Sequence, residues 1–149
     1  IDLDSGRVEP HPRPASLKNE AIDVIASFAP DFHVGRRYEG TIKGTVAFVR
    51  PPHQAVEACR QSARPGLVVA PSFQAGKPAA LSAVPRAQAF ADLVDQSMNY
   101  HVLLRRGFDA MAALVENCNH YRISYGDLDQ AIEAISRLHH DRGRRLAVA

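Results

Sequence analysis

The chain of 149 residues has no tryptophan, two methionines and only two cysteines, Cys59 and Cys118. Two thiols without CxxC spacing exclude a disulfide-rich scaffold and a cysteine-based zinc module. One disulfide between them is an alternative, but a chain of this length can bury a sufficient core without it. We therefore expect both cysteines to be buried as small apolar side chains.

Long apolar runs are missing as well. No segment approaches the roughly 20 apolar residues that cross a bilayer, and no signal-peptide pattern is present. These absences predict a cytoplasmic protein without a membrane partner. The chain begins with Ile1 rather than Met, which indicates a fragment, a processed product or the ordered part of something longer.

An excess of charge of one sign is also lacking, because 18 Lys and Arg residues against 16 Asp and Glu residues leave a formal charge of +2. This small balance does not by itself indicate a nucleic-acid or membrane partner. No phosphate-binding loop, dinucleotide motif, nucleophile elbow or metal-ligand spacing occurs. The sequence therefore predicts no cofactor, no metal site and no catalytic residue, and it favours a binding protein over an enzyme.

What the first half of the chain does contain is a change of pattern. Residues 1–15 carry the turn signal DSG and several prolines, which predict an extended arm. Ser16 can cap a helix over residues 16–29, where apolar residues recur at helical spacing. Residues 32–50 are rich in β-branched and aromatic residues and predict two or three short antiparallel strands, and residues 67–73 predict a further strand.

Two segments between these elements are less regular. Residues 53–63 fit either a short helix or a strand. Residues 74–85 are dominated by small residues and predict a loop. From Pro85 to residue 120, two apolar stripes are in phase, which permits one helix of about 35 residues with Gly107 as the position for a kink, but leaves open whether these residues form one helix or two.

The C-terminal part predicts a second helix. Residues 119–124 are expected to connect the two helices. Ser124 followed by Asp127 resembles a capping arrangement, and an amphipathic face follows it. Gly143 is expected to end this helix.

Together these patterns predict the α+β class: a small antiparallel β unit (about residues 32–73) with an N-terminal helix and a C-terminal long helical hairpin. The chain is expected to form a single domain, 1–149. Its parts are the extended arm (1–15), an α/β portion (16–83), the helical hairpin (84–143) and a basic tail (144–149).

The long helix is the main candidate for function, because its apolar surface is wider than one short helix can cover. We therefore predict a non-enzymatic interaction or assembly subunit that self-associates as a homo-oligomer or docks on a protein partner. The candidate interaction residues are Phe90, Val94, Met98, Val102, Phe108, Met111 and Val115.

Two alternatives stay open. One is a nucleic-acid-associated protein that contacts phosphates through clustered basic side chains. The other is a small enzyme without a recognisable motif. Basic residues in the last turn of a helix also suit the negative end of its dipole, which is the simpler interpretation of the tail. The candidate phosphate contacts are Arg36, Arg37, Lys43, Arg142, Arg144 and Arg145.

The tail provides a first test. We expect the double variant Arg144→Gln/Arg145→Gln to keep its fold and its oligomeric state, because both residues follow Gly143, where the dipole effect has faded. Circular dichroism and light scattering measure both properties. Sequence-selective DNA or RNA binding by the parent chain, abolished in the variant, would promote the nucleic-acid alternative.

Overall fold

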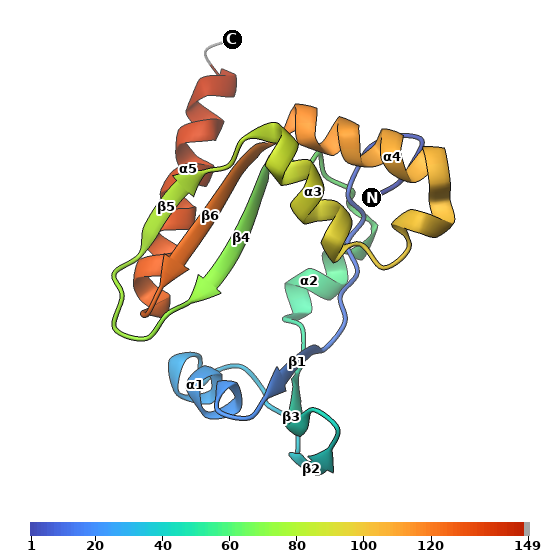
Figure 1. Cartoon of the computed structure of the whole chain (residues 1–149). Helices are drawn as coiled ribbons and strands as arrows, with labels where there is room; N and C mark the ends of the chain where they lie inside the picture. Colours follow the sequence, from blue (N-terminus) through green and yellow to red (C-terminus); the bar gives the residue numbers. More distant parts are fainter. Residues whose placement is uncertain (148–149) are drawn as a thin grey trace. The chain divides into compact units, whose positions relative to one another are not determined.

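A computed structural model describes the backbone of residues 1–147 and the side chains of residues 1–141. Its five α-helices and two three-stranded sheets confirm the predicted α+β class (Figure 1). Backbone contacts divide the chain into two compact units. We call Val8–Ala63 the smaller unit, and Ile1–Arg7 together with Arg64–Ala149 the larger unit. Within residues 1–147, no helix combines the length and apolar character that a membrane crossing requires.

The smaller unit is built on an antiparallel sheet of strand order β1-β3-β2. Its central strand carries most of the buried residues, and Ile22 of the neighbouring helix is also buried. The strands predicted within residues 32–50 are confirmed as a hairpin of β2 and β3. The elements are β1 (Ala15–Lys18), α1 (Ala21–Phe28), β2 (Tyr38–Thr41), β3 (Gly44–Val49), α2 (His53–Glu57) and a 3₁₀ turn, η1 (Ala58–Arg60).

The prediction of a helix over residues 16–29 was wrong at its start. Ser16 does not cap a helix but lies in β1, paired with Phe48 of β3, and α1 begins only at Ala21. Asn19 makes the turn between the two elements with a positive φ of 49°, and the Thr45 N–H donates to its Oδ1 (3.0 Å). Pairing with β3 therefore overrides the local helical spacing.

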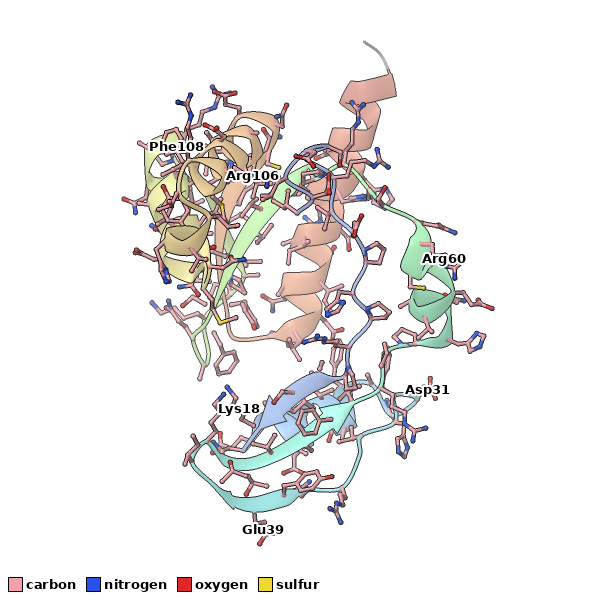
Figure 2. All side chains as sticks on the ribbon, turned by 90° about the vertical axis from the view of Figure 1, so that its right-hand side faces the viewer. Lys18, Asp31, Glu39, Arg60, Arg106 and Phe108 are labelled. Atoms are coloured by element: carbon pink, nitrogen blue, oxygen red, sulfur yellow. The ribbon has the colours of Figure 1, made fainter. Side chains whose placement is uncertain are left out.

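The larger unit holds a mixed sheet of strand order β4-β6-β5, with β4 parallel and β5 antiparallel to β6. Figure 2 shows this sheet between α3 and α4 on one side and α5 on the other. Its elements are β4 (Leu67–Phe73), β5 (Ala80–Ala83), α3 (Arg86–Gln96), α4 (Tyr100–Asn117), β6 (Asn119–Tyr125) and α5 (Leu128–Ala147).

The predicted strand over residues 67–73 is confirmed, but its place in the fold was not predicted. It pairs with β6 rather than with the hairpin, so the single β unit expected over residues 32–73 is divided between two sheets. The loop expected over residues 74–85 contains β5, and the connection expected over 119–124 is the central strand β6. Both errors have one cause, because short strands acquire their identity from partners that are distant in sequence.

Whether residues 85–120 form one helix or two was left open by the sequence, and the structure has two. Residues 97–99 separate α3 from α4, and α4 itself changes direction at Leu104, not at Gly107 (Figure 1). Leu104 has a φ of 50° and a ψ of −127°, outside the helical region. The two in-phase stripes therefore belong to helices that fold back on each other.

The last helix is confirmed, with Ala131 buried against the sheet side. Its start differs from the prediction, because Ser124 lies in β6 and Asp127 caps the helix by accepting the Gln130 N–H (2.9 Å). The helix does not end at Gly143 but continues to Ala147. A glycine weakens a helix interior by only about 1 kcal/mol, so it is not sufficient to end one.

The end of β6 is fixed by a close approach of backbone at Gly126. Its N–H donates to the Lys77 carbonyl (2.8 Å), and a Cβ at this position would lie 2.6 Å from the Gln74 carbonyl oxygen. Only a residue without a side chain fits between β6 and the β4–β5 loop without moving backbone atoms.

We expect Gly126→Ala to lower the stability of β6 by about 3 kcal/mol, because its Cβ overlaps backbone rather than a flexible side chain. Hydrogen exchange of the β6 amides measures this loss. The matched control is Gly76→Ala in the same loop, where φ is 74° but the space is open, at a cost of about 1 kcal/mol. Equal losses in the two variants would contradict the close approach.

Candidate functional site

The two faces of β6 differ in chemistry. Alternate residues of a strand point to opposite faces, which separates His120 and Arg122 from Tyr121 and Ile123. Arg122 contacts a side chain of α3 and His120 contacts the backbone of α4, so their face is directed at these two helices. Ile123 is almost fully buried on the other face, the side on which α5 lies.

A pocket of about 530 Å³ lies where the α3-facing side of the sheet meets α3. Strand residues of β4 and β6 form its floor, and the second half of α3 forms its wall. Most of the lining is apolar, with a few polar groups among it. The lining residues are Val68, Val69, Ala70, Pro71, Val84, Ala89, Asp92, Leu93, Asp95, Gln96, His120, Tyr121 and Arg122.

An ion pair crosses the pocket from sheet to helix. Arg122 Nη2 donates to Asp92 Oδ2 at 2.5 Å, and Gln88 Nε2 donates to Asp92 Oδ1 at 2.8 Å. The Gln88 hydrogen bond, followed by the bond from Arg122, lowers the pKa of Asp92 below its ordinary value. Because the pair is partly exposed, it positions side chains more than it stabilises the fold.

His120 is the buried polar residue of the site, with 6% of its surface exposed. Its Nε2 lies 3.1 Å from the Val115 carbonyl oxygen, which can only accept, so Nε2 carries the proton. In the neutral ring, Nδ1 is then a hydrogen-bond acceptor. That atom is buried and has no partner within the described part of the chain. An unpaired buried acceptor costs about 1–3 kcal/mol.

The predicted interaction residues fall into three groups, exposed, buried and half-buried. Met98, Val102 and Phe108 are 92%, 69% and 51% exposed, whereas Val115 is 5% exposed. The remaining three, Phe90, Val94 and Met111, are half-buried. The Phe90 ring contacts the rings of Tyr100 and Phe108 at centroid distances of 6.4 and 5.3 Å, which joins α3 to α4.

Leu104 adds to the exposed group and was missed by the periodicity. Its side chain is 73% exposed, and it is the residue at which α4 breaks. We call Met98, in the turn before α4, together with Val102, Leu104 and Phe108 of α4, the apolar segment of α4. Figure 2 labels Phe108 on the side of the larger unit away from α5.

Three of the candidate phosphate contacts, Arg36, Arg37 and Lys43, have described side chains, and all three belong to the smaller unit. Arg37 binds both oxygens of Asp23, and Arg36 lies over the Tyr38 ring at 4.5 Å. Lys43 is exposed in the β2–β3 turn. The side chains of Arg142, Arg144 and Arg145 lie outside the described residues.

The cysteines follow the prediction in part. Cys118 is buried, but Cys59 is exposed on η1, because this short turn is not covered by other elements of its unit. No disulfide joins them. Among the side chains described, no three His, Cys, Asp or Glu residues lie close enough to hold a metal ion.

No family model, curated protein or solved structure matches the chain. Its function is therefore argued from the site alone.

The ion pair gives a pH test. We expect Gln88→Ala to raise the pKa of Asp92 toward its ordinary value, and Arg122→Gln, which removes a positive charge, to raise it as well. Because the folded-state pKa is lowered, the stabilisation is present above the unfolded-state pKa and is lost as the pH falls through the folded value. Carboxyl NMR titration measures the change. Asp23, whose pKa is lowered by Arg37, is the internal control and should not move.

Proposed function

We propose that this protein is a non-enzymatic assembly subunit that self-associates through the apolar segment of α4. The observation that supports it is the exposure of Met98, Val102, Leu104 and Phe108 within eleven consecutive residues. Single exposed apolar side chains are common, but a concentration of large ones is typical of a contact surface. Residues 97–104 contain no Asp, Glu, Lys or Arg.

The partner that fits this segment best is a second copy of the chain. An uncharged stretch can meet its own copy without like-charge repulsion. The two arginines of the segment follow this uncharged stretch and are already paired, Arg105 with Asp109 and Arg106 with Asp4. A partner of opposite charge therefore gains little at this surface.

The backbone of Leu104 supports the same proposal. A non-glycine residue at this φ and ψ costs about 1–3 kcal/mol, and such strain concentrates at functional positions. In the free chain, the residue with the strained backbone also exposes a large apolar side chain to solvent. Burial against a second copy compensates for it, at roughly 25 cal/mol for each Å² of apolar surface.

The nucleic-acid alternative has no comparable support. Two of its candidate contacts, Arg36 and Arg37, already have partners in the smaller unit. An enzyme without a known motif and a location in the cytoplasm stay predictions.

We expect Met98→Asp to abolish self-association without loss of folding, because Met98 is 92% exposed and the charge enters solvent in the single chain. Sedimentation equilibrium over a range of protein concentrations measures the mass, and circular dichroism measures the fold. Ile42→Asp in the smaller unit is the matched control, since Ile42 is also a fully exposed apolar residue. It should leave the mass unchanged.

A second variant separates strain from contact. Leu104→Gly should raise the stability of the single chain by about 1 kcal/mol or more, because glycine adopts this backbone without strain, and it should weaken association. A parent chain that is monomeric at every concentration, or a Met98→Asp variant that still associates, would remove the basis of the proposal. In that case, light scattering with added nucleic acid at low and high salt tests the alternative.

A further inference from the structure

The pocket between α3 and the sheet has the properties of a small-molecule site. Its volume of about 530 Å³ is within the range of roughly 300–1,000 Å³ in which such ligands bind. Val68, Ala70 and Leu93 provide an apolar surface for the body of a ligand, and the polar groups are few. None of these residues belongs to the apolar segment of α4, so the pocket is independent of self-association.

The formal charge of the lining is negative. It contains one arginine against two aspartates, which leaves one negative charge. Arg122 is already bound to Asp92, so it does not neutralise Asp95. An anionic ligand would have to break the Arg122–Asp92 pair, whereas a cation can bind at Asp95 and leave that pair intact.

The end of α3 strengthens this preference. Asp95 lies in the last turn of an 11-residue helix, and that turn contains no basic residue. The negative end of the helix dipole and a carboxylate therefore coincide, an arrangement that is unfavourable until a cation is present. Most helices meet this need with their own Lys or Arg near the C-terminus.

His120 adds a second acceptor. Its buried Nδ1 has no partner among the described residues, and the side chain to which it belongs lines the pocket. Asp95 and His120 thus leave acceptors without a partner in the lining, beside the amide of Gln96 and the hydroxyl of Tyr121. A ligand that suits it must carry N–H or O–H donors.

We propose that this pocket binds a small ligand with an ammonium group on an apolar body. The ammonium lies at Asp95 and the C-terminal end of α3, and the apolar body lies over Val68, Ala70 and Leu93. Because Nδ1 of His120 is closed to solvent, it pairs with a donor of the ligand only after the lining side chains shift on binding.

The test uses three probes with one apolar body: phenethylamine, 2-phenylethanol and phenylacetate. Binding to the full chain is measured by ¹⁵N-edited NMR. The amine should bind with chemical-shift changes at α3 and β6, the alcohol more weakly, and the carboxylate least. Asp95→Asn should weaken amine binding about threefold, because this carboxylate is exposed and solvent screens its charge. Asp129→Asn, on α5 and outside the pocket, is the matched control and should have no effect.

His120 is tested without a variant, because a substitution at this buried position could prevent folding. The ¹⁵N shift of its Nδ1 should change when the amine binds. Equal or tighter binding of phenylacetate, full amine affinity in Asp95→Asn, or no binding of the amine would each overturn the proposal. A Nδ1 shift that stays constant under saturating amine would overturn the role of His120.

Discussion

The larger unit depends on the pairing of β4 and β5 with the strand between them. Neither outer strand pairs with the other, so β6 alone makes them a sheet. The alternation of β6 directs Ile123 to the buried α5 side and Arg122 to the α3 side. One strand thus contributes a core residue, the pocket floor and the partner of Asp92.

The turn between α3 and α4 connects the two surfaces to which function is assigned. Asp95 lies in the last turn of α3, just before it, and Met98 lies within it. On one side, the chain concentrates negative charge at a helix end beside a partly apolar pocket. On the other, it leaves large apolar side chains in solvent and tolerates a strained residue, Leu104. Both features are locally unfavourable in the isolated chain, and we propose that each is relieved by a partner of a different kind.

The local sequence pattern was sufficient to predict some elements of the fold but not others. The α+β class, the β2–β3 hairpin and α5 could be predicted because their signals lie within a few residues. Ser16 was predicted to cap a helix because the apolar residues after it recur at helical spacing. Only its pairing with Phe48, which is distant in sequence, makes it a strand residue. An 18-residue phase between Phe90 and Phe108 is equally compatible with one straight helix and with two helices that fold back. The pocket could not be predicted, because its floor and wall come from three separate parts of the chain.

The position of β6 also determines when the larger unit can form its sheet. Leu67 can pair only after Asn119 has been synthesised, since the parallel register joins residues about fifty positions apart. Loop closure over that distance is slow. During synthesis, β4 and β5 emerge before the strand that they require. Until then the apolar segment LVVAPSF has no strand of its own unit to pair with. Pro71 within it cannot donate a backbone hydrogen bond, which weakens pairing with a strand of another chain. The order of synthesis thus makes the central strand the last strand to arrive, and a chain that stops before residue 119 has no sheet in this unit.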